Sequence, residues 1–291
     1  MDIGVISVRG SDYHPNRRLL EAARRRGCRL GLVDPYRTGP GIMQGVLGMG
    51  GMENTGPPRV ILPRQGAQIG DSSLTVLAQF AAMGIVLVND VPAISVARNK
   101  FLTLQALAGS GLPVPDTFFA NSGALVYNAI NRLGGYPVVA KKLSGRQGAE
   151  VFLLTSRQDA ERIVDEHLEP GQGVLLQGFI APEGRRDLRV MVIGGNVAAA
   201  AEFFPKPGDF RSNFHLGGNI RGVSISGDIE KFAADSARAV GLDIAGVDLV
   251  VDAAGAPWVI EVNYSPGFRG LEAATGKDVA AEIIDFAMSY I

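Results

Sequence analysis

The sequence predicts a mixed α/β protein in which a parallel sheet comes first and antiparallel hairpins follow. Residues 2–8 and 29–34 are apolar runs on either side of a helical segment that ends at Gly27. This is a βαβ unit, which implies parallel strands. Residues 187–204 and 246–263 each hold two apolar runs joined by a short glycine-containing turn, which is typical of a β-hairpin. A chain of 291 residues is long enough for two or three subdomains with cores of their own.

Hydrophobic periodicity and glycine or proline breaks predict the remaining elements. Asn16 is expected to cap the first helix, which runs to about residue 26 with Leu19, Leu20 and Ala23 inward. Residues 40–58 are rich in Gly and Met without periodicity, so we expect a mobile loop there, with a functional lid as the alternative. We expect strands over 59–63, 85–89, 114–120 and 174–180, a hairpin within 136–154, a polar loop over 205–219, and helices over 72–83, 95–109, 125–133, 156–167, 228–240 and 278–291.

Composition excludes several classes of protein. The net charge of −1 gives no global field that favours nucleic acid or a membrane surface. A single cysteine, Cys28, excludes an internal disulfide and a Cys-based zinc site. No apolar run reaches membrane-spanning length, so we expect a cytoplasmic protein without a membrane partner or a direct nucleic-acid partner. The arginines at 17, 18, 24, 25, 26 and 29 are interpreted as the solvated face of one helix, or as a dock for an acidic partner.

The last hairpin, 246–263, brings two carboxylates together. If its turn centres on Ala254–Gly255, Asp248 lies directly across from Glu261, and Asn263 shares the face of Glu261. Facing carboxylates repel each other unless a cation lies between them. Carboxylate and amide oxygens suit Mg²⁺, although two surface carboxylates on a solvated hairpin face are the simpler interpretation.

A lysine at a strand end beside a glycine turn is an arrangement that binds phosphate. The segment from Lys141 to Gly148, with Ser144 and Gly145 in its turn, fits this chemistry. Strand alternation directs only one of Lys141 and Lys142 inward, and we choose Lys141. Two lysines that are merely solvated at a hairpin tip are the alternative.

Two further polar segments carry candidate residues. Arg211 and Asn213 lie two residues apart in a polar loop, where they offer a bidentate fork and a neutral donor. His215 in the same loop is interpreted as a hydrogen-bond partner rather than a general base, because nothing pairs it with a nucleophile. Asp187 and Arg189 alternate onto one strand face, either as a structural ion pair or as ligands of a ribose or phosphate. No nucleophile elbow and no Walker A pattern is present in the sequence.

Together these pieces resemble the ATP-grasp carboxylate–amine ligases, and within them the RimK-like glutamate ligases. The motifs that carry the resemblance are ARNK, VVAKKLSGRQG, LLQGFI, RRDLRVMVIGG, GDFRSNFHLGG, AGVDLVV and EVNYSPG. They extend over nearly the whole chain. The resemblance implies an ATP-grasp fold with a Rossmann-like pre-ATP-grasp domain over 1–92, a central subdomain with a glycine-turn lid over 93–178, and a C-terminal subdomain with the metal site over 179–291.

The resemblance also implies a reaction. ATP would phosphorylate an acceptor carboxylate, and the amino group of glutamate or another amino acid would attack the acyl-phosphate to form an amide. The acceptor would be a protein C-terminus, a glutamate-tailed cofactor or a small molecule, and a homo-oligomer is expected by analogy. The resemblance implies that Lys100 and Lys141 contact the ATP phosphates and that the turn with Ser144, Gly145 and Gly148 closes over them. Gln177, Gly178 and Phe179 would contact adenine, and Asp187 would lie beside the nucleotide. Arg211 and Asn213 would hold the γ-phosphate or acyl-phosphate, and Asp248, Glu261 and Asn263 would bind Mg²⁺ or Mn²⁺.

The sequence departs from the family pattern at two places. Gly178 replaces an acidic residue that usually follows the linker glutamine, and Phe203–Phe204 stands after Glu202 where basic residues are common. The first departure bears on adenine binding and the second on recognition of an acidic acceptor. Two rival functions are a non-catalytic ATP-binding sensor or scaffold, and an ATP-grasp ligase of another pathway, such as lysine biosynthesis or peptide ligation.

Overall fold

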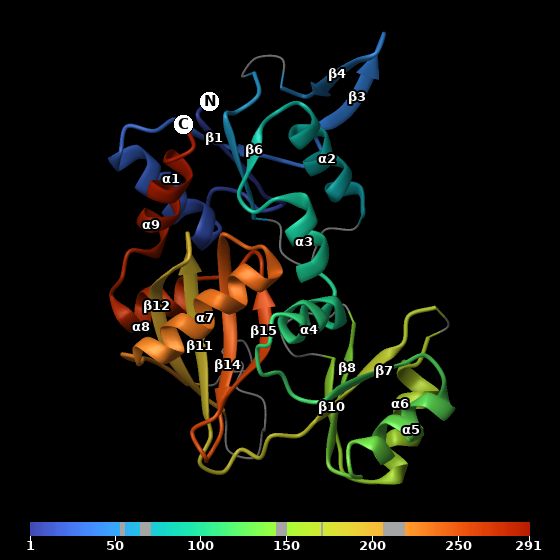
Figure 1. Ribbon diagram of the computed structural model, residues 1–291. Helices are drawn as coiled ribbons and strands as arrows, with labels where there is room; N and C mark the ends of the chain where they lie inside the picture. Colours follow the sequence, from blue (N-terminus) through green and yellow to red (C-terminus); the bar gives the residue numbers. More distant parts are fainter. Residues whose placement is uncertain (53–55, 65–70, 144–149, 170, 206–218) are drawn as a thin grey trace.

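The computed structural model describes residues 1–52, 56–64, 71–143, 150–169, 171–205 and 219–291. Figure 1 shows an α/β part formed by the start of the chain at the top, a sheet with helices formed by the end of the chain below it, and a smaller part formed by the middle of the chain at the lower right. Both chain ends lie near each other at the top left.

The N-terminal part is a parallel sheet, as the βαβ pattern predicts. Within the described residues its strand order is β2-β1-β5-β6. The chain passes from β1 to β2 on one side and then returns to β5 on the other side of β1, so the direction of winding reverses between β1 and β5. The elements are β1 (Ile3–Ile6), α1 (His14–Arg25), β2 (Leu30–Val33), β5 (Val60–Pro63), α2 (Asp71–Ala82) and β6 (Val86–Leu87).

Residues 39–50 form a hairpin, so the prediction of an unstructured loop there is wrong. Strand β3 (Gly39–Met43) pairs with β4 (Val46–Gly50) and makes a sheet of its own. Gln44 and Gly45 both have positive φ, 52° and 78°, which a two-residue turn of type I′ requires. Because both strands are largely exposed, the alternation of apolar and polar residues that marks a half-buried strand is missing from the sequence.

The start of α1 also differs from the expectation. Tyr13 occupies the N-cap position without a side-chain cap, and Pro15 lies in the first turn. Asn16 is buried inside the helix, and its amide donates to the backbone oxygens of Arg9 at 2.8 Å and Gly10 at 3.0 Å. Asn16 therefore fixes the loop that follows β1 instead of capping the helix.

The middle of the chain forms an antiparallel sheet in the order β7-β10-β8-β9, counted over the residues that the structure describes. Helices α5 and α6 cover it, and Ser156 and Asp159 form a capping box at the start of α6. The elements are β7 (Thr117–Ala120), α5 (Gly123–Arg132), β8 (Val138–Lys142), β9 (Val151–Leu154), α6 (Arg157–His167) and β10 (Val174–Gly178).

The C-terminal sheet has the order β13-β12-β11-β14-β15 in the described part of the chain. Helix α7 lies on one face and helices α8 and α9 lie against the other. Strand β13 and helix α8 were not predicted, since both are short and follow glycine-rich segments. The elements are β11 (Arg186–Ile193), β12 (Asn196–Phe204), β13 (Asn219–Gly222), α7 (Gly227–Val240), β14 (Ile244–Val251), β15 (Pro257–Asn263), α8 (Arg269–Thr275) and α9 (Val279–Met288).

The single helix predicted over 95–109 is two helices, α3 (Val91–Ala97) and α4 (Lys100–Gly109). The side chain of Asn99 accepts hydrogen bonds from the backbone N–H groups of Phe101 and Leu102, which starts a new helix at this point. Leu104 and Leu107 of α4 belong to the core beneath the C-terminal sheet. Helix α4 thus packs against the C-terminal part rather than against the central sheet.

The cores divide the molecule into two bodies. Two apolar clusters each combine residues of the N-terminal and C-terminal sheets, for example Ile3 with Met191 and Ile6 with Val190. A third cluster, which includes Val126, is built wholly from residues 118–176. The N-terminal and C-terminal parts therefore share their packing, whereas the central part has a core of its own.

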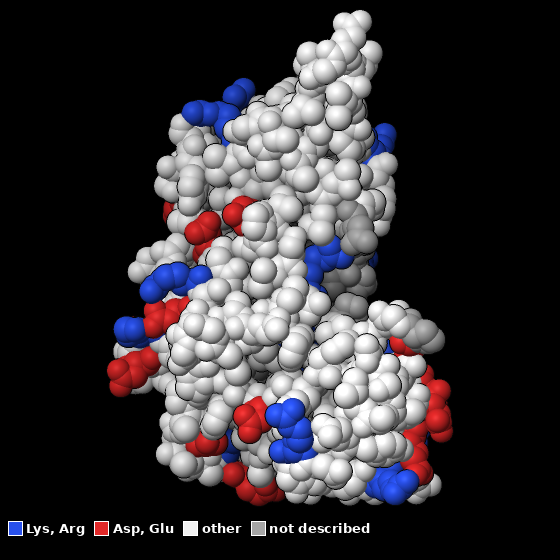
Figure 2. Space-filling view, turned by 45° about the vertical axis from the view of Figure 1, so that its right-hand side comes forward, with Lys and Arg blue, Asp and Glu red and all other residues white. Residues whose placement is uncertain are grey.

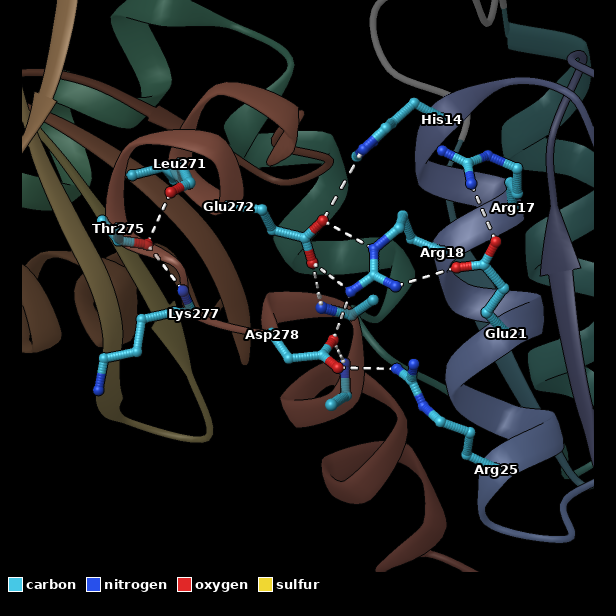
Figure 3. Close-up of polar contacts among 12 residues, drawn as sticks. His14, Arg17, Arg18, Glu21, Arg25, Leu271, Glu272, Thr275, Lys277 and Asp278 are labelled. Atoms are coloured by element: carbon cyan, nitrogen blue, oxygen red, sulfur yellow. Dashed lines mark hydrogen bonds and ion pairs between the residues drawn. The ribbon is translucent and has the colours of Figure 1, made fainter.

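Ion pairs between α1 and the helices α8 and α9 add to this shared packing (Figure 3). Arg18 donates to Glu272 at 2.9 Å and to Asp278 at 2.8 Å, and Arg25 donates to Asp278 at 2.7 Å. Arg26 pairs with Asp285 of α9. The interpretation of these arginines as a solvated face is therefore wrong for Arg18 and Arg26, whose acidic partners lie on the last helices of the same chain, whereas Arg25 is paired and still 52% exposed.

Candidate functional site

One face of the C-terminal sheet changes from apolar to polar along its strands. At one end Met191, Ile193 and Ile244 are buried beneath α9. Two residues further along the same face, β11 presents Arg189 and β14 presents Asp248, since side chains alternate along a strand. The sheet therefore holds charged groups beside a rigid apolar base.

Asp248 and Glu261 face each other on this polar end, in the register that the sequence predicts. Gly246 pairs with Asn263, which places Asn263 on the same face. A bulge follows Asp248, where Leu249 pairs with Val259. Within the described residues no hydrogen bond or ion pair engages the carboxylate of Glu261. A half-buried carboxylate opposite another carboxylate thus keeps its oxygens available to a cation.

Arg189 holds Asp248, a pairing that the sequence analysis missed. The guanidinium donates from Nε and Nη2 to the two carboxylate oxygens, each at 2.6 Å. The two residues are register partners on neighbouring strands, and Arg189 also lies 5.2 Å from the centre of the Phe203 ring. Of the two alternatives for Asp187 and Arg189, the ion pair between them is not formed: Arg189 pairs with Asp248 across the sheet, and Asp187 pairs with Arg185 at 3.0 Å.

Lys141 reaches this face from the central sheet. Its Nζ donates to Gln177 Oε1 at 2.6 Å, and Gln177 Nε2 donates to Thr117 Oγ1 at 2.9 Å. Burial lowers the pKa of Lys141 to about 8, and the nearby charges of Glu261 and Asp248 raise it while Lys100 lowers it further. Lys141 of the central sheet is therefore close enough to Lys100 of α4 and to Asp248 and Glu261 of the C-terminal sheet for their charges to act on it.

Lys142 points to the opposite face of β8. Its Nζ lies 3.5 Å from Glu150 and 3.3 Å from Glu169. Of the two lysines, the one that we chose as inward, Lys141, is the one on which the charges of Glu261 and Asp248 act.

The strand that the resemblance assigns to adenine is β10 and the residues after it. Gln177 is buried and its side chain positions Lys141. The backbone N–H of Gly178 donates to the oxygen of Asp116 at 2.8 Å. That N–H group is thus already used, and Gln177 and Gly178 are also register partners of Val139 and Val138 on β8.

The second departure from the family pattern also has a structural context. Phe203 is buried beside Arg189, and Phe204 lies 5.2 Å from the guanidinium of Arg221 on β13. Arg221 and Arg186 both pair with the buried Glu202, at 3.5 Å and 3.0 Å. Basic groups are present at this corner, but they come from neighbouring strands.

Several expected site residues lie outside the described residues, namely Ser144, Gly145, Gly148, Arg211, Asn213 and His215. Among the residues that are described, no three His, Cys, Asp or Glu side chains gather as a metal cluster. The Asp248–Glu261 pair with Asn263 is therefore a two-carboxylate site, which suits a cation that also takes oxygens from phosphates.

A hollow of about 440 Å³ lies elsewhere, next to the start of α7. Leu188, Ile225 and Val251 line it, and Leu188 belongs to the face of the sheet that α7 covers. It is thus on the opposite side of the sheet from Asp248. Over the described residues, no helix has the length and apolar character needed to cross a membrane.

Comparisons with known proteins agree with this arrangement. A model of the RimK-like ATP-grasp domain matches residues 97–287, and a model of the RimK pre-ATP-grasp domain matches residues 1–94. Proteins named probable alpha-L-glutamate ligase from Thioalkalivibrio sulfidiphilus and Syntrophotalea carbinolica are each 40% identical to this chain, over 98% of it and 95% of their own length.

Solved structures show the same fold. The ATP-grasp ligase PsnB complexed with a minimal precursor has a TM-score of 0.79 at 22% identity and covers 100% of this chain and 99% of its own. A RimK domain protein from Sphaerobacter thermophilus has a TM-score of 0.77 at 24% identity, covering 99% of this chain and 100% of its own. The expected ATP-grasp fold with a pre-ATP-grasp domain is confirmed. The chain therefore belongs to the RimK-like ATP-grasp family and is an ATP-dependent ligase.

Proposed function

We propose that this ligase joins the amino group of glutamate to an acceptor carboxylate. The γ-phosphoryl group of ATP passes to an oxygen of the acceptor carboxylate, which gives an acyl-phosphate and ADP. The amino group of glutamate then attacks the acyl carbon, the amide bond forms, phosphate leaves and the amine gives up a proton. The names of the relatives, probable alpha-L-glutamate ligase, support glutamate as the amine.

The observation that carries the proposal is the meeting of Lys141 with Asp248 and Glu261 across two sheets. A lysine close to a carboxylate pair supplies the groups that a triphosphate and its cation need. Positioning and charge neutralisation are the main contributions a protein makes to phosphoryl transfer.

The donor set fits Mg²⁺ or Mn²⁺. Asp248, Glu261 and Asn263 would hold the ion, and each carboxylate oxygen of Asp248 keeps a lone pair beyond its bond to Arg189. The ion supplies Lewis-acid stabilisation of phosphate charge. Arg189 holds the Asp248 carboxylate in one orientation on the sheet and offsets its charge. A neighbouring solved structure, PsnB with Mg and ADP, binds this pair of ligands in its own site.

The chain's other groups bind and orient the nucleotide in this proposal. Lys100 and Lys141 contact the phosphates, and the backbone of Gln177–Phe179 contacts adenine without the N–H of Gly178. Asp187 lies beside the nucleotide. The turn with Ser144, Gly145 and Gly148, and the pair Arg211 and Asn213, close over the phosphates and hold the acyl-phosphate. The proposed subdomains are 1–92, 93–178 and 179–291.

The acceptor is a protein C-terminus, a glutamate-tailed cofactor or a small acid. PsnB and MdnC, two of the neighbouring structures, are bound to precursor peptides, so a peptide acceptor belongs in any screen. We further propose a cytoplasmic homo-oligomer.

The test is a screen of ADP release by the purified chain. L-glutamate is combined with each acceptor class in the presence and absence of Mg²⁺, and the products are analysed by mass spectrometry. We expect ADP release that requires Mg²⁺ together with one acceptor and glutamate, and a product heavier by whole glutamyl residues. ADP release that is equal with and without glutamate for every acceptor would contradict the proposal.

A further inference from the structure

Ligand-binding groups also gather at the carboxyl ends of β1 and β5, where His14 and Arg64 lie. The winding of the N-terminal sheet reverses between these two strands. In open α/β sheets, ligands bind outside the carboxyl ends of the strands at such a switch point. The loop after β1 leads to His14 at the start of α1, and β5 is followed directly by Arg64, whose backbone N–H donates to Ile6 O at 2.9 Å.

Arg64 is half-buried, and its guanidinium is incompletely paired. Its Nη2 donates to the backbone oxygen of Pro266 at 2.6 Å, and its guanidinium lies 5.4 Å from the centre of the Phe268 ring. Its Nε and Nη1 are buried and have no hydrogen-bond partner, and among the described residues no carboxylate pairs with it. Burial lowers the pKa of Arg64 to about 10, so it stays protonated at neutral pH.

Unpaired, buried guanidinium nitrogens lower the free energy of unfolding, which is unfavourable if Arg64 has only a structural role. A buried charge that lacks a partner destabilises a protein, and buried polar atoms almost always have hydrogen bonds. Natural proteins keep such unfavourable groups mainly at functional sites. The Nε–Nη edge of an arginine fork is also the geometry that binds a carboxylate through two parallel hydrogen bonds.

His14 shares the surroundings of Arg64. Its ring lies edge-on to Phe268 with 6.0 Å between ring centres, and its Nδ1 is buried without a partner. Figure 3 shows its other nitrogen directed toward Glu272, at 3.8 Å. Burial lowers the pKa of His14, so it is neutral at pH 7 and adds a polar group without adding charge.

Arg64 lies close to the face of the sheet that carries Asp248. A Cβ placed on Gly246 would lie 2.6 Å from the Pro266 side chain, so Pro266 covers the strand on the side to which Asp248 points. Gly246 and Asp248 are separated by about 7 Å along the strand. The guanidinium bound to Pro266 is thus next to the proposed phosphate and cation site. Figure 2 shows one group of basic side chains at the right of the face drawn, about half-way down the molecule, and others at its left side and lower end.

We propose that Arg64, with His14 beside it, forms the subsite that binds an unreacting carboxylate of the incoming amino acid. The inference rests on the proposed function and adds to it. The carboxylate accepts hydrogen bonds from Nε and Nη1 of Arg64, and the amino group of the same molecule is then held near the acyl-phosphate. The pre-ATP-grasp part of the chain thereby orients the incoming amino acid, and it selects an acidic one where the carboxylate held is that of the side chain.

The test measures glutamate binding and turnover separately. Equilibrium dialysis with L-glutamate, in the presence of Mg²⁺ and a non-hydrolysable ATP analogue, gives the Kd for wild type, Arg64→Met and Arg64→Lys. ADP release gives KM for glutamate and for ATP. We expect Arg64→Met to raise the Kd and KM for glutamate about tenfold or more, and to leave KM for ATP within twofold. We expect Arg64→Lys, which keeps the charge but loses the fork, to raise them less.

Arg132→Met is the matched control. Arg132 also lies over an aromatic ring, at 4.4 Å from the centre of Phe118, but belongs to α5 in the central part. We expect its glutamate Kd to equal that of wild type. If Arg64→Met fails to fold by circular dichroism, Arg64→Lys carries the comparison.

Ligand analogues identify the carboxylate. If the subsite binds the α-carboxylate, wild type is expected to bind glutamate more tightly than 4-aminobutyrate, which lacks that group. If the subsite binds the side-chain carboxylate, wild type is expected to bind glutamate more tightly than glutamine, which lacks that group. Arg64→Met is expected to lose one of these two preferences.

Three results would overturn the subsite. They are an unchanged glutamate Kd in both Arg64 variants, both preferences retained by Arg64→Met, and no glutamate binding by wild type. Failure of the proposed function is distinct, because it appears as an absence of glutamate-dependent ADP release in wild type.

Discussion

The two bodies of this molecule are stabilised differently. The N-terminal and C-terminal parts share two apolar clusters and the arginine–carboxylate pairs between α1 and the last two helices. The central part has one cluster of its own, built wholly from residues 118–176. The carboxylates Asp248 and Glu261 are on the first body and Lys141 is on the second. The first body, made of the N-terminal and C-terminal parts, thus carries the proposed cation site. The second body, the central part, contributes a lysine to it.

The largest effect should come from removing the carboxylate of Glu261, which belongs to the first body. We expect Glu261→Gln to lower ADP release about 100-fold or more, since charge stabilisation at the phosphates is lost. Far-UV circular dichroism and the melting temperature should stay unchanged, because no described residue depends on Glu261 for a hydrogen bond. Glu230→Gln, on the exposed side of α7, is the control and should keep full activity. Normal turnover by Glu261→Gln would show that the carboxylate pair takes no part in the reaction.

The separate core of the central part predicts a local defect. Leu154 is 1% exposed, and Leu154→Ala should cost about 2–5 kcal/mol through lost burial and a cavity. Hydrogen exchange should speed up within 117–178 and stay near wild type in β1, β11 and β14. Equal loss of protection in the N-terminal sheet would mean that the two bodies unfold as one.

The shared interface predicts a global defect instead. Arg18 has 19% and Glu272 has 10% of its side chain exposed, so Arg18→Met leaves a mostly buried carboxylate without its main partner. We expect a loss of about 2–3 kcal/mol in the free energy of unfolding, measured by urea denaturation. Arg17→Met is the control: Arg17 is 53% exposed and pairs with Glu21 on the same helix, and its removal should cost about 0.5 kcal/mol or less. Similar losses for the two variants would show that the interface pairs add little.

The smallest effect concerns the lysine that the second body contributes. With its pKa lowered to about 8, Lys141 is charged below pH 7 and loses its proton as the pH rises through 8. Bound phosphate would hold that proton, so the affinity for an ATP analogue should fall about fourfold between pH 7 and 8.5. Lys141→Arg should bind with little change over this range. A pH-independent affinity in wild type would show that Lys141 does not contact phosphate.

Local patterns predicted much of this structure. The β-branched runs of 246–263 fix the pairing of Asp248 with Glu261, and alternation along β8 distinguishes Lys141 from Lys142. These features depend on neighbours in sequence, which periodicity describes well.

Features that depend on distant pairing were not predicted. Arg189 finds Asp248 because β11 lies beside β14, and Arg18 finds Glu272 across 254 positions of the sequence. A local sequence pattern predicts neither of these two side-chain contacts. The exposed β3–β4 hairpin lacks the alternation of a half-buried strand, and Asn16 follows a proline that starts the helix earlier.

The central claim is that Glu261 and Asp248 hold a cation that grips the nucleotide. The most direct measurement is calorimetric titration of a non-hydrolysable ATP analogue into wild type and Glu261→Gln, each with and without Mg²⁺. We predict that Mg²⁺ strengthens binding to wild type and has little effect on the variant. An equal gain from Mg²⁺ in both proteins would contradict the account.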